Sequence, residues 1–499
     1  MARLLPIPKA WPGRLHGKFR LFLAVCSGSF FAAYASSVLA LDQEASRLPI
    51  AFSNLGEAVE LKPQGLGHIL QRQAGQQNVK LANRLLVRAG STIGAQDLRN
   101  LSANIEGAQK LAALQTSNLW VLTFSGADMR GTMDRVREGQ GVLYVQPDLS
   151  QPRQAAQMMA PSRPPAEIPH AGAMPETGRA RVAIIDDGFQ LEHPALAKTR
   201  LIFQYDADQR TEDAHPKTAL DQHGTLVAGL VLSATGLAPG AEFIAIRQVS
   251  SWTSDMVLAF SVARMLKADI VNSSWAMPFL PEPLFDLLAD WLDEAQPYLV
   301  FAAGNNRQDA CAANAFSQLK GAWLVGAWQP YSNHGPCVTL QAPSRFMSTA
   351  SAGGYQPFTG TSAAAAYVSG LLARELGQGR HGDPASRAVA QDQCLRFLQA
   401  SGCVDAQELA QRLPGWRAAD APRQWALQVT GGVVAASERF AFTQPFTGLE
   451  VIERAGTVIG DNDGQPVVTP YDECVLVMPS TRQARAGVTV VRFATRRPL

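Results

Sequence analysis

The chain has 499 residues, 46% of them hydrophobic, and a formal net charge of +2 at pH 7. This length accommodates about two to four domains with apolar cores. A nearly neutral charge balance lacks the basic surface that nucleic-acid binding requires, so we exclude a nucleic-acid partner.

Residues 1–40 have the composition of an export signal. Basic residues precede an uncharged stretch from Leu21 to Leu41, and Val38-Leu39-Ala40 ends on the small residue after which a signal peptidase cuts. We therefore expect a periplasmic or extracellular protein. Because the stretch is close to the length of a spanning helix, an uncleaved anchor is the alternative, and only then would the chain contact a membrane.

Residues 79–148 show a small α+β pattern, preceded by a polar, glycine-rich stretch near 62–78. Hydrophobic periodicity predicts strands over Arg84 to Arg88, Leu119 to Phe124 and Val142 to Val145, and helices over Ala95 to Leu114 and Met129 to Glu138. Residues 149–178 are rich in proline and alanine without apolar periodicity, which predicts an exposed linker.

Residues 179–400 alternate between predicted strands and helices. This alternation is typical of an α/β domain with a parallel sheet covered by helices on both faces. The predicted strands are Val182 to Ile185, Ala268 to Asn272 and Trp323 to Trp328, and the predicted helices are Pro283 to Ala295 and Ala363 to Leu376.

Three residues at the ends of these elements have the chemistry of a serine peptidase. Asp186 follows the first strand, and His223 and Ser362 each open a helix of small residues. A serine hydroxyl becomes nucleophilic when an imidazole takes its proton and a carboxylate orients that imidazole. We predict that Asp186 is the orienting carboxylate, His223 the base and Ser362 the nucleophile.

Acyl transfer also needs a donor for the oxygen that becomes negatively charged, worth about 3 to 4 kcal/mol in the barrier. Asn305 follows an apolar run that starts at Leu299, and its side-chain amide is the predicted donor, together with the backbone N–H of Ser362. His193 and His215 are rivals of His223, but only His223 opens a small-residue helix.

Asp187, next to the predicted catalytic carboxylate, has a different expected role. It is the first residue of an Asp-Gly pair that follows the strand. We predict a turn residue or a supporting carboxylate, and not an acid-base group.

The chain order of these three residues and their flanking sequences resemble the subtilase family of serine peptidases. The matching segments are RVAIIDDG around Asp186, DQHGTLVAG around His223, GLAP at 236–239, ADIVN at 268–272, GN at 304–305, AP at 342–343 and FTGTSAAAAYVSG around Ser362. The resemblance implies a subtilisin-like fold that hydrolyses peptide bonds in protein or peptide substrates without a cofactor. Subtilases often bind calcium, but the sequence locates no calcium site.

Three details resemble the kexin and furin branch of that family: Asp186-Asp187-Gly188, Ser274-Trp275, and the alanines after Ser362. That branch recognises basic residues through acidic side chains, whereas here the first acid after the Ser-Trp pair is Glu282. By resemblance, the pocket for the residue before the cleaved bond is lined by Ser274, Trp275, Ala276, Ala302, Ala303 and Gly304. None of them is charged, so we expect an apolar or broad preference.

Residues 79–148 resemble a subtilase propeptide in position and size and in their closing segment, VLYVQPD at 142–148. The resemblance implies a folding assistant and temporary inhibitor that interacts with its own catalytic domain. A permanent N-terminal domain without an inhibitory role is the alternative.

The catalytic region also departs from the family at two places. Ala366-Tyr367 stand where subtilases usually carry Pro-His, and Leu226 follows the His-Gly-Thr triplet in place of His. We predict an exported, self-processing endopeptidase, and the alternative is a catalytically weak subtilase fold that serves as a binding or regulatory module.

After a connecting segment at 401–432, residues 433–499 contain short β-branched runs between turns, which predict a small antiparallel β-domain. Residues 456–479 loosely resemble the β-domain of the succinylglutamate desuccinylase and aspartoacylase family. None of the eight histidines begins the H-x-x-E pair that binds zinc there, so we expect no metal site and disfavour a hydrolase acting through this domain. Asp461 to Gly464 predict a hairpin turn in preference to a calcium loop.

Five cysteines follow Cys26, and their spacing matches no zinc motif. In an exported protein we expect disulfides, with Cys311 to Cys337 and Cys394 to Cys403 as the pairs nearest in sequence and one thiol left over. A lipid-modified Cys26 is disfavoured because the preceding residue is bulky.

Overall fold

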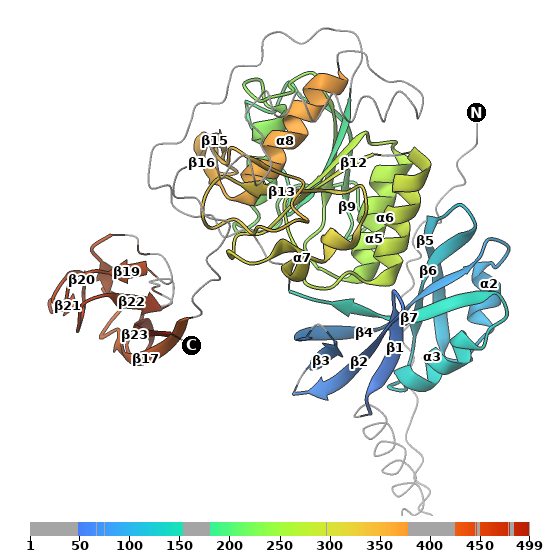
Figure 1. Ribbon diagram of the computed structural model, residues 1–499, viewed down its shortest axis with the longest axis horizontal. Coiled ribbons are helices and arrows are strands. Elements are labelled where there is room, and N and C mark those ends of the chain that lie inside the picture. The colour runs from blue at the N-terminus through green and yellow to red at the C-terminus, as the bar shows by residue number, and fades with distance from the viewer. Residues whose placement is uncertain are drawn as a thin grey trace, which may run out of the picture. The chain divides into compact units, whose positions relative to one another are not determined.

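The computed structural model describes residues 48–152, 180–377 and 425–498, with short gaps at 66, 74, 296, 445, 447–449, 478 and 480–483. The expected signal segment, most of the expected linker, and Cys394 and Cys403 lie outside the described residues. The chain divides into two compact units, Met1–Gln151 with Trp252–Ser254, and Pro152–Ser251 with Asp255–Leu499. Figure 1 draws the N-terminal unit in blue to cyan, the following α/β part in green to orange and the C-terminal strands in red.

The N-terminal unit contains a seven-stranded antiparallel sheet with the order β1-β2-β3-β4-β6-β5, in which β7 also pairs with β4. Its strands are β1 (Ile50–Asn54), β2 (Glu57–Gln64), β3 (Gly67–Arg72), β4 (Gly75–Gly90), β5 (Ile105–Ala113), β6 (Ser117–Phe124) and β7 (Val142–Ser150). Its helices are α2 (Ala95–Arg99) and α3 (Met129–Arg137). The long strand β4 joins the hairpins of β1 to β3 to the rest of the sheet, so the unit begins well before residue 79.

One expectation for this unit is wrong. The helix expected over Ala95 to Leu114 ends at Arg99, after which residues 105–113 form β5, and the polar stretch near 62–78 forms hairpins. Strand β5 pairs antiparallel with β6, and Lys110 Nζ lies 5.5 Å from the centre of the Trp120 ring on that strand. This pairing between strands overrides the local helix propensity of the segment. The three predicted strands and the helix predicted from Met129 are confirmed.

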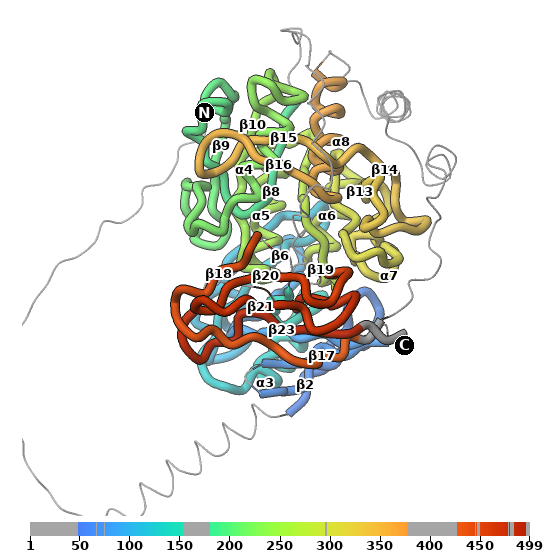
Figure 2. Tube along the Cα trace, turned by 90° about the vertical axis from the view of Figure 1, so that its left-hand side faces the viewer, coloured from blue at the N-terminus to red at the C-terminus, as the bar shows by residue number. Residues whose placement is uncertain are grey.

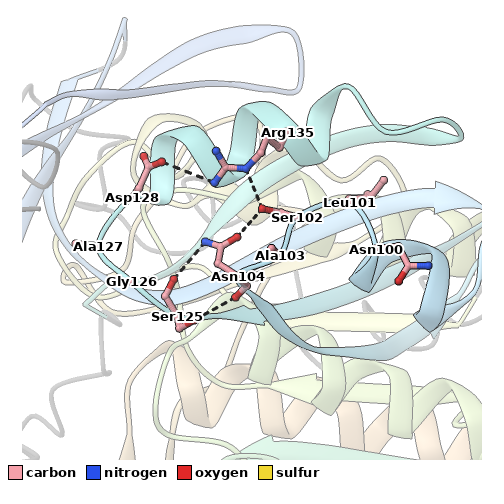
Figure 3. Close-up of a pocket in the computed structure, with 10 residues that line it drawn as sticks. All are labelled: Asn100, Leu101, Ser102, Ala103, Asn104, Ser125, Gly126, Ala127, Asp128 and Arg135. Carbon is pink, nitrogen blue, oxygen red and sulfur yellow. Dashed lines mark hydrogen bonds and ion pairs between the residues drawn. The ribbon is translucent and has the colours of Figure 1, made fainter. Parts of the chain in front are cut away.

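A surface hollow of about 560 Å³ lies between α3 and the loops at 100–104 and 125–128 (Figure 3). Its polar side chains bond to one another. Arg135 Nε donates to Ser102 Oγ at 2.8 Å, Ser102 Oγ donates to Asn104 Oδ1 at 2.6 Å, and Asn104 Nδ2 donates to the carbonyl oxygen of Ser125 at 3.2 Å. The network fixes both loops to α3.

Residues Trp252–Ser254 belong to the N-terminal unit through hydrogen bonds with the end of β7. The buried carboxylate of Asp148 accepts hydrogen bonds from Ser254 N at 3.0 Å, Ser254 Oγ at 2.7 Å and Arg84 Nε at 2.6 Å. Burial raises the pKa of Asp148, and the Arg84 guanidinium opposes that shift. Three donors therefore satisfy a carboxylate that has no access to water.

The second unit is built on a seven-stranded parallel sheet with the order β14-β13-β12-β11-β8-β10-β9. Its strands are β8 (Arg181–Asp186), β9 (Arg200–Asp206), β10 (Glu242–Arg247), β11 (Ile270–Ser273), β12 (Tyr298–Ala302), β13 (Trp323–Ala327) and β14 (Leu340–Ala342). After β8 the chain forms β9 and then β10 on one side of β8, and later β11 on the other side, so the switch point lies between β8 and β11. Ligands bind open parallel sheets at the carboxyl ends of such strands. The three predicted strands and the α/β fold class are confirmed.

Helices cover both faces of this sheet. Helices α4 (His223–Leu232) and α8 (Thr361–Leu376) contact each other over β8 and β11 to β14. Ala363 to Ala366 are fully buried, and their small side chains allow this close packing. Helices α5 (Thr253–Met265) and α6 (Glu282–Ala295) lie side by side on the opposite face (Figure 1), joined by Arg264 and Asp290 at 2.7 Å.

Shorter elements complete the α/β part. Helix α7 (Ala310–Ala313) and the 3₁₀ turn η1 (Ala315–Gln318) follow β12. The antiparallel hairpin of β15 (Arg345–Thr349) and β16 (Tyr355–Thr359) contacts both α4 and α8 (Figure 2). In it, Ser348 Oγ donates to the carbonyl oxygen of Leu226 at 2.6 Å, which fixes the hairpin to α4.

The C-terminal strands form two antiparallel sheets, as predicted, with the orders β17-β23-β22-β19 and β18-β20-β21. They are β17 (Trp425–Val434), β18 (Ala441–Phe442), β19 (Glu450–Ile452), β20 (Val458–Asp461), β21 (Pro466–Val468), β22 (Cys474–Val477) and β23 (Thr489–Pro498). Strand β17 starts before the expected boundary at 433. Its glycine pair and the register shift after Val429 obscure the alternation that predicts strands.

The turn expected at 461–464 is confirmed, because Gly464 N donates to Asp461 Oδ1 at 2.8 Å and β20 pairs with β21. Of the expected disulfides, Cys311–Cys337 is present. Cys474 is a buried thiol outside any disulfide. In the described ranges, no helix combines the length and the apolar character that crossing a membrane requires.

Candidate active site

Asp186 and His223 come together at the switch point. Asp186 is the last residue of β8 and is 3% exposed, and His223 is the first residue of α4. Nδ1 of His223 lies 2.8 Å from Oδ1 of Asp186, within hydrogen-bond distance. A Cβ atom on Gly224 would lie 2.5 Å from the carbonyl oxygen of Gly188, so only glycine lets α4 begin this close to the strand. The carboxylate can therefore fix the orientation of the imidazole.

Asp187 holds the start of α4. Its carboxylate accepts hydrogen bonds from the backbone N–H groups of His223, at 3.0 Å, and Gly224, at 2.7 Å. A carboxylate at a helix N-terminus satisfies N–H groups that have no partner within the helix. Burial and the neighbouring charge of Asp186 raise the pKa of Asp187 to about 6. The residue is a supporting carboxylate, as the sequence predicts.

Ser362 is the second residue of α8 and is fully buried. Its Oγ donates to the carbonyl oxygen of Ser274 at 2.9 Å, and Ser274 Oγ donates to the carbonyl oxygen of Ser362 at 3.1 Å. Ser274 directly follows β11, the strand beside β8. The serine is therefore tied to the same switch point that Asp186 and His223 occupy.

Asn305 lies beside the turn that leads to Ser362. Its Oδ1 accepts a hydrogen bond from Thr361 N at 2.9 Å, and Thr361 Oγ1 accepts one from Gly304 N at 3.1 Å. Asn305 Nδ2 is buried and makes no hydrogen bond with the described part of the chain. A buried amide donor without a partner is the group that a developing oxyanion requires.

The expected pocket residues lie in two segments next to these groups. Ser274, Trp275 and Ala276 follow β11, whereas Ala302, Ala303 and Gly304 end β12 and continue from it. Trp275 Nε1 donates to the carbonyl oxygen of Ile185 at 3.0 Å, and its ring packs edge-on against Phe316. Trp275 therefore contributes to the core, and the role of both segments in substrate binding stays a prediction.

The rival histidines are engaged elsewhere. His193 Nε2 lies 2.9 Å from the carbonyl oxygen of Gly354. His215 lies between two carboxylates, at 2.6 Å from Asp213 and 2.8 Å from Glu192. Across the residues that the structure describes, no three or more His, Cys, Asp or Glu side chains gather in a group that could hold a metal ion.

Two further residues, which the sequence analysis missed, support the site. Tyr331 Oη accepts a hydrogen bond from Gly360 N at 3.1 Å, two residues before Ser362. Asn333 Nδ2 donates to the carbonyl oxygen of Ala303 at 3.0 Å. The turn-forming residues that follow Tyr331 mark a loop, but nothing in the sequence indicates what this loop contacts.

Residues 178–386 match the family described as the subtilase family. This segment belongs to the subtilase family. The match does not extend to residues 425–498, so the resemblance of the C-terminal strands to the succinylglutamate desuccinylase and aspartoacylase family stays a prediction.

The subtilase segment is similar to several curated proteins. A thermophilic serine proteinase of Bacillus sp. (strain AK1) is 29% identical over 235 residues, which cover 42% of this chain and 55% of the relative. Endoprotease bli-4 of Caenorhabditis elegans is 27% identical over 233 residues, covering 39% of this chain and 25% of the relative. A calcium-dependent protease of Trichormus variabilis is 34% identical over 104 residues, covering 19% and 16%. The chain thus spans about half the length of the first relative and less of the others.

Among solved structures, fervidolysin from Fervidobacterium pennivorans has a TM-score of 0.49 at 17% identity, with 60% of this chain and 55% of that chain covered. A cold-adapted subtilisin-like serine proteinase has a TM-score of 0.37 at 24% identity, with 42% of this chain and 80% of that chain covered.

Proposed function

We propose that the protein is an exported serine endopeptidase in which Asp186, His223 and Ser362 hydrolyse peptide bonds. The observation that carries the proposal is the contact of 2.8 Å between Asp186 Oδ1 and His223 Nδ1 at the switch point. Membership of the subtilase segment in a family of serine peptidases supports it.

The proposed chemistry uses these three groups in turn. The Ser362 hydroxyl first rotates away from the carbonyl oxygen of Ser274. It then gives its proton to His223 Nε2 while Ser362 Oγ forms a bond to the scissile carbonyl carbon. The bond from that carbon to the leaving nitrogen then breaks, and the nitrogen takes the proton from His223. Water, deprotonated by the same imidazole, releases the acyl group and restores Ser362.

Asn305 is the proposed donor for the oxygen that becomes charged in this reaction. Its Oδ1 is held by Thr361 N at 2.9 Å, which leaves the buried Nδ2 group to donate. The backbone N–H of Ser362, at the start of α8, is the proposed second donor. The chemistry needs no cofactor. Because one relative is named a calcium-dependent protease, activity is best measured both with calcium and with a chelator.

We also propose that residues 79–148, with the strands before them, act as a propeptide. Two observations support this proposal: the N-terminal unit is compact by itself, and in the sequence it precedes the subtilase segment. Export is proposed from the signal pattern of residues 1–40.

A fluorophosphonate probe tests the peptidase proposal. The probe should label the wild-type chain at Ser362 and leave Ser362→Ala unlabelled, and labelling should abolish peptide hydrolysis. A folded wild-type chain that the probe does not label would instead support a catalytically weak binding module.

A further inference from the structure

The loop that carries Asn305 has an unusual backbone. Gly304 has a φ of +107° and Arg307 has a φ of +57°, so two residues of the loop lie in the left-handed region. That conformation costs free energy for Arg307, a residue with a side chain. Contacts from outside the loop must therefore hold it in place.

Asn333 supplies those contacts. It is fully buried, and its Nδ2 donates to the carbonyl oxygen of Ala303 at 3.0 Å. Its Oδ1 accepts hydrogen bonds from the backbone N–H groups of Asn306 and Gln308, both at 3.0 Å. Its own N–H donates to the carbonyl oxygen of Gly304 at 2.8 Å. One residue thus satisfies four backbone groups on both sides of Asn305.

The packing of Asn333 also explains the glycine before Asn305. A Cβ atom on Gly304 would lie 2.5 Å from Asn333 Nδ2, which is closer than real contacts allow. The asparagine amide therefore occupies the space that a side chain at 304 would need, and it forces the loop to turn there.

The segment that contains Asn333 also contacts the turn before Ser362. Tyr331 Oη accepts a hydrogen bond from Gly360 N at 3.1 Å, and the carbonyl oxygen of Tyr331 accepts one from Arg307 N at 3.0 Å. A Cβ atom on Gly360 would lie 3.0 Å from Asn305 Nδ2, so these two loops are in close contact. The disulfide Cys311–Cys337 joins the residues that follow the Asn305 loop to those that follow Asn333.

We propose that Asn333 is a positioning residue for the proposed oxyanion donor: it holds residues 303–308 in the conformation that directs Asn305 Nδ2 at the substrate carbonyl. The inference rests on the proposed function, and it assigns to Asn333 no contact with substrate. A loop displaced by about 1 Å can reduce turnover by about a hundredfold.

The test compares Asn333→Ala with a matched variant, Asn314→Ala. Asn314 is also fully buried, and its amide also bonds backbone groups, to Ala302 O at 2.9 Å and from Phe316 N at 3.2 Å. Both variants should lower the melting temperature. Only Asn333→Ala should lower kcat, by about 10- to 100-fold with KM changed less than about twofold.

A double-mutant cycle separates positioning from general damage. In the Asn305→Ala background, Asn333→Ala should reduce kcat by less than about threefold further, because the donor that it positions is gone. Asn314→Ala should have the same effect on kcat with and without Asn305. Full additivity of Asn333→Ala and Asn305→Ala would overturn the inference.

A second variant covers the case in which Asn333→Ala does not fold. Asn333→Asp has nearly the same size and keeps both acceptor bonds, but it places a carboxylate oxygen where the amide nitrogen donates to the carbonyl oxygen of Ala303 at 3.0 Å. The two oxygens repel each other and disturb the loop at that point, so a folded Asn333→Asp protein should also lose kcat. Wild-type kcat in a folded Asn333→Asp protein would overturn the inference.

Ser362→Ala sets the baseline in every assay. If turnover depends on Ser362 while the Asn333 variants keep their kcat, this inference alone is wrong. If the wild-type chain shows no turnover that depends on Ser362, the proposed function is wrong and this inference falls with it.

Discussion

The carboxylate of Asp187 accepts a hydrogen bond from the backbone N–H of His223 at 3.0 Å. The residue after the end of β8 thus holds the first turn of α4, while Asp186 contacts the imidazole of the same histidine. Two neighbouring carboxylates therefore fix His223 at its backbone and at its ring. Like charges this close oppose each other, and the pKa of Asp187 rises to about 6 from burial and from Asp186.

This raised pKa predicts a pH-dependent effect of Asp187→Asn on stability. The folded protein holds the Asp187 proton up to about pH 6, whereas the unfolded chain releases it near pH 3.8. Between these two values the free energy of unfolding therefore falls as pH rises. The melting temperature of Asp187→Asn relative to wild type should therefore increase from pH 4 to pH 8.

Asp213→Asn is the control with the opposite sign. Hydrogen bonds from Lys217 and His215 hold the pKa of Asp213 below its usual range. Its contribution is present above the unfolded pKa and is lost at lower pH, so the variant should lose melting temperature relative to wild type as pH rises, though weakly because the group is exposed. Equal pH profiles for the two variants would contradict the assignment.

Substitution of the three proposed catalytic groups should abolish turnover in a folded protein. Ser362→Ala, His223→Ala and Asp186→Asn should each reduce kcat by at least about a thousandfold, and combinations should lose little more because the groups act as a unit. Circular dichroism checks that each variant is folded, and peptide-hydrolysis kinetics measure its kcat. Additive losses would argue against a common mechanism.

Asn305→Ala should reduce kcat about a hundredfold to a thousandfold with a small change in KM, because its amide is expected to donate mainly in the transition state. Steady-state kinetics on one peptide substrate measure this. A variant that lost only affinity would show that Asn305 binds substrate and does not stabilise the oxyanion.

The preferred residue before the cleaved bond should be apolar, or the preference broad. The two segments expected to line the pocket, 274–276 and 302–304, contain no charged side chain. A peptide-library cleavage profile measures the preference directly. A profile dominated by Arg or Lys would contradict the proposed pocket.

Local sequence patterns singled out Asp186, His223, Ser362 and Asn305, because each follows or opens a segment that is apolar or rich in small residues, and their catalytic roles stay predictions. The patterns failed where pairing with distant residues decides the structure. Residues 105–113 look helical but pair with β6, and the polar segments of β2 and β3 become strands through hairpins. Asn333 bonds groups 25 to 30 residues away, and no local periodicity reports such contacts.

The chain should cut itself between Asp148 and Gly178. Strand β7 ends at Ser150, and the segment that follows carries the proline-rich composition of an exposed linker. An extended segment can lie in a protease cleft as an added strand, and a covalently linked one is present at high effective concentration. Purified protein should therefore show a new N-terminus in that window by mass spectrometry, and the released N-terminal part should inhibit activity when added back.

The Ser362→Ala variant is the control. Expressed without other proteases, it should stay uncut. Identical processing of that variant would assign the cut to an outside protease, and an intact wild-type chain with full activity would show that residues 79–148 are a permanent domain.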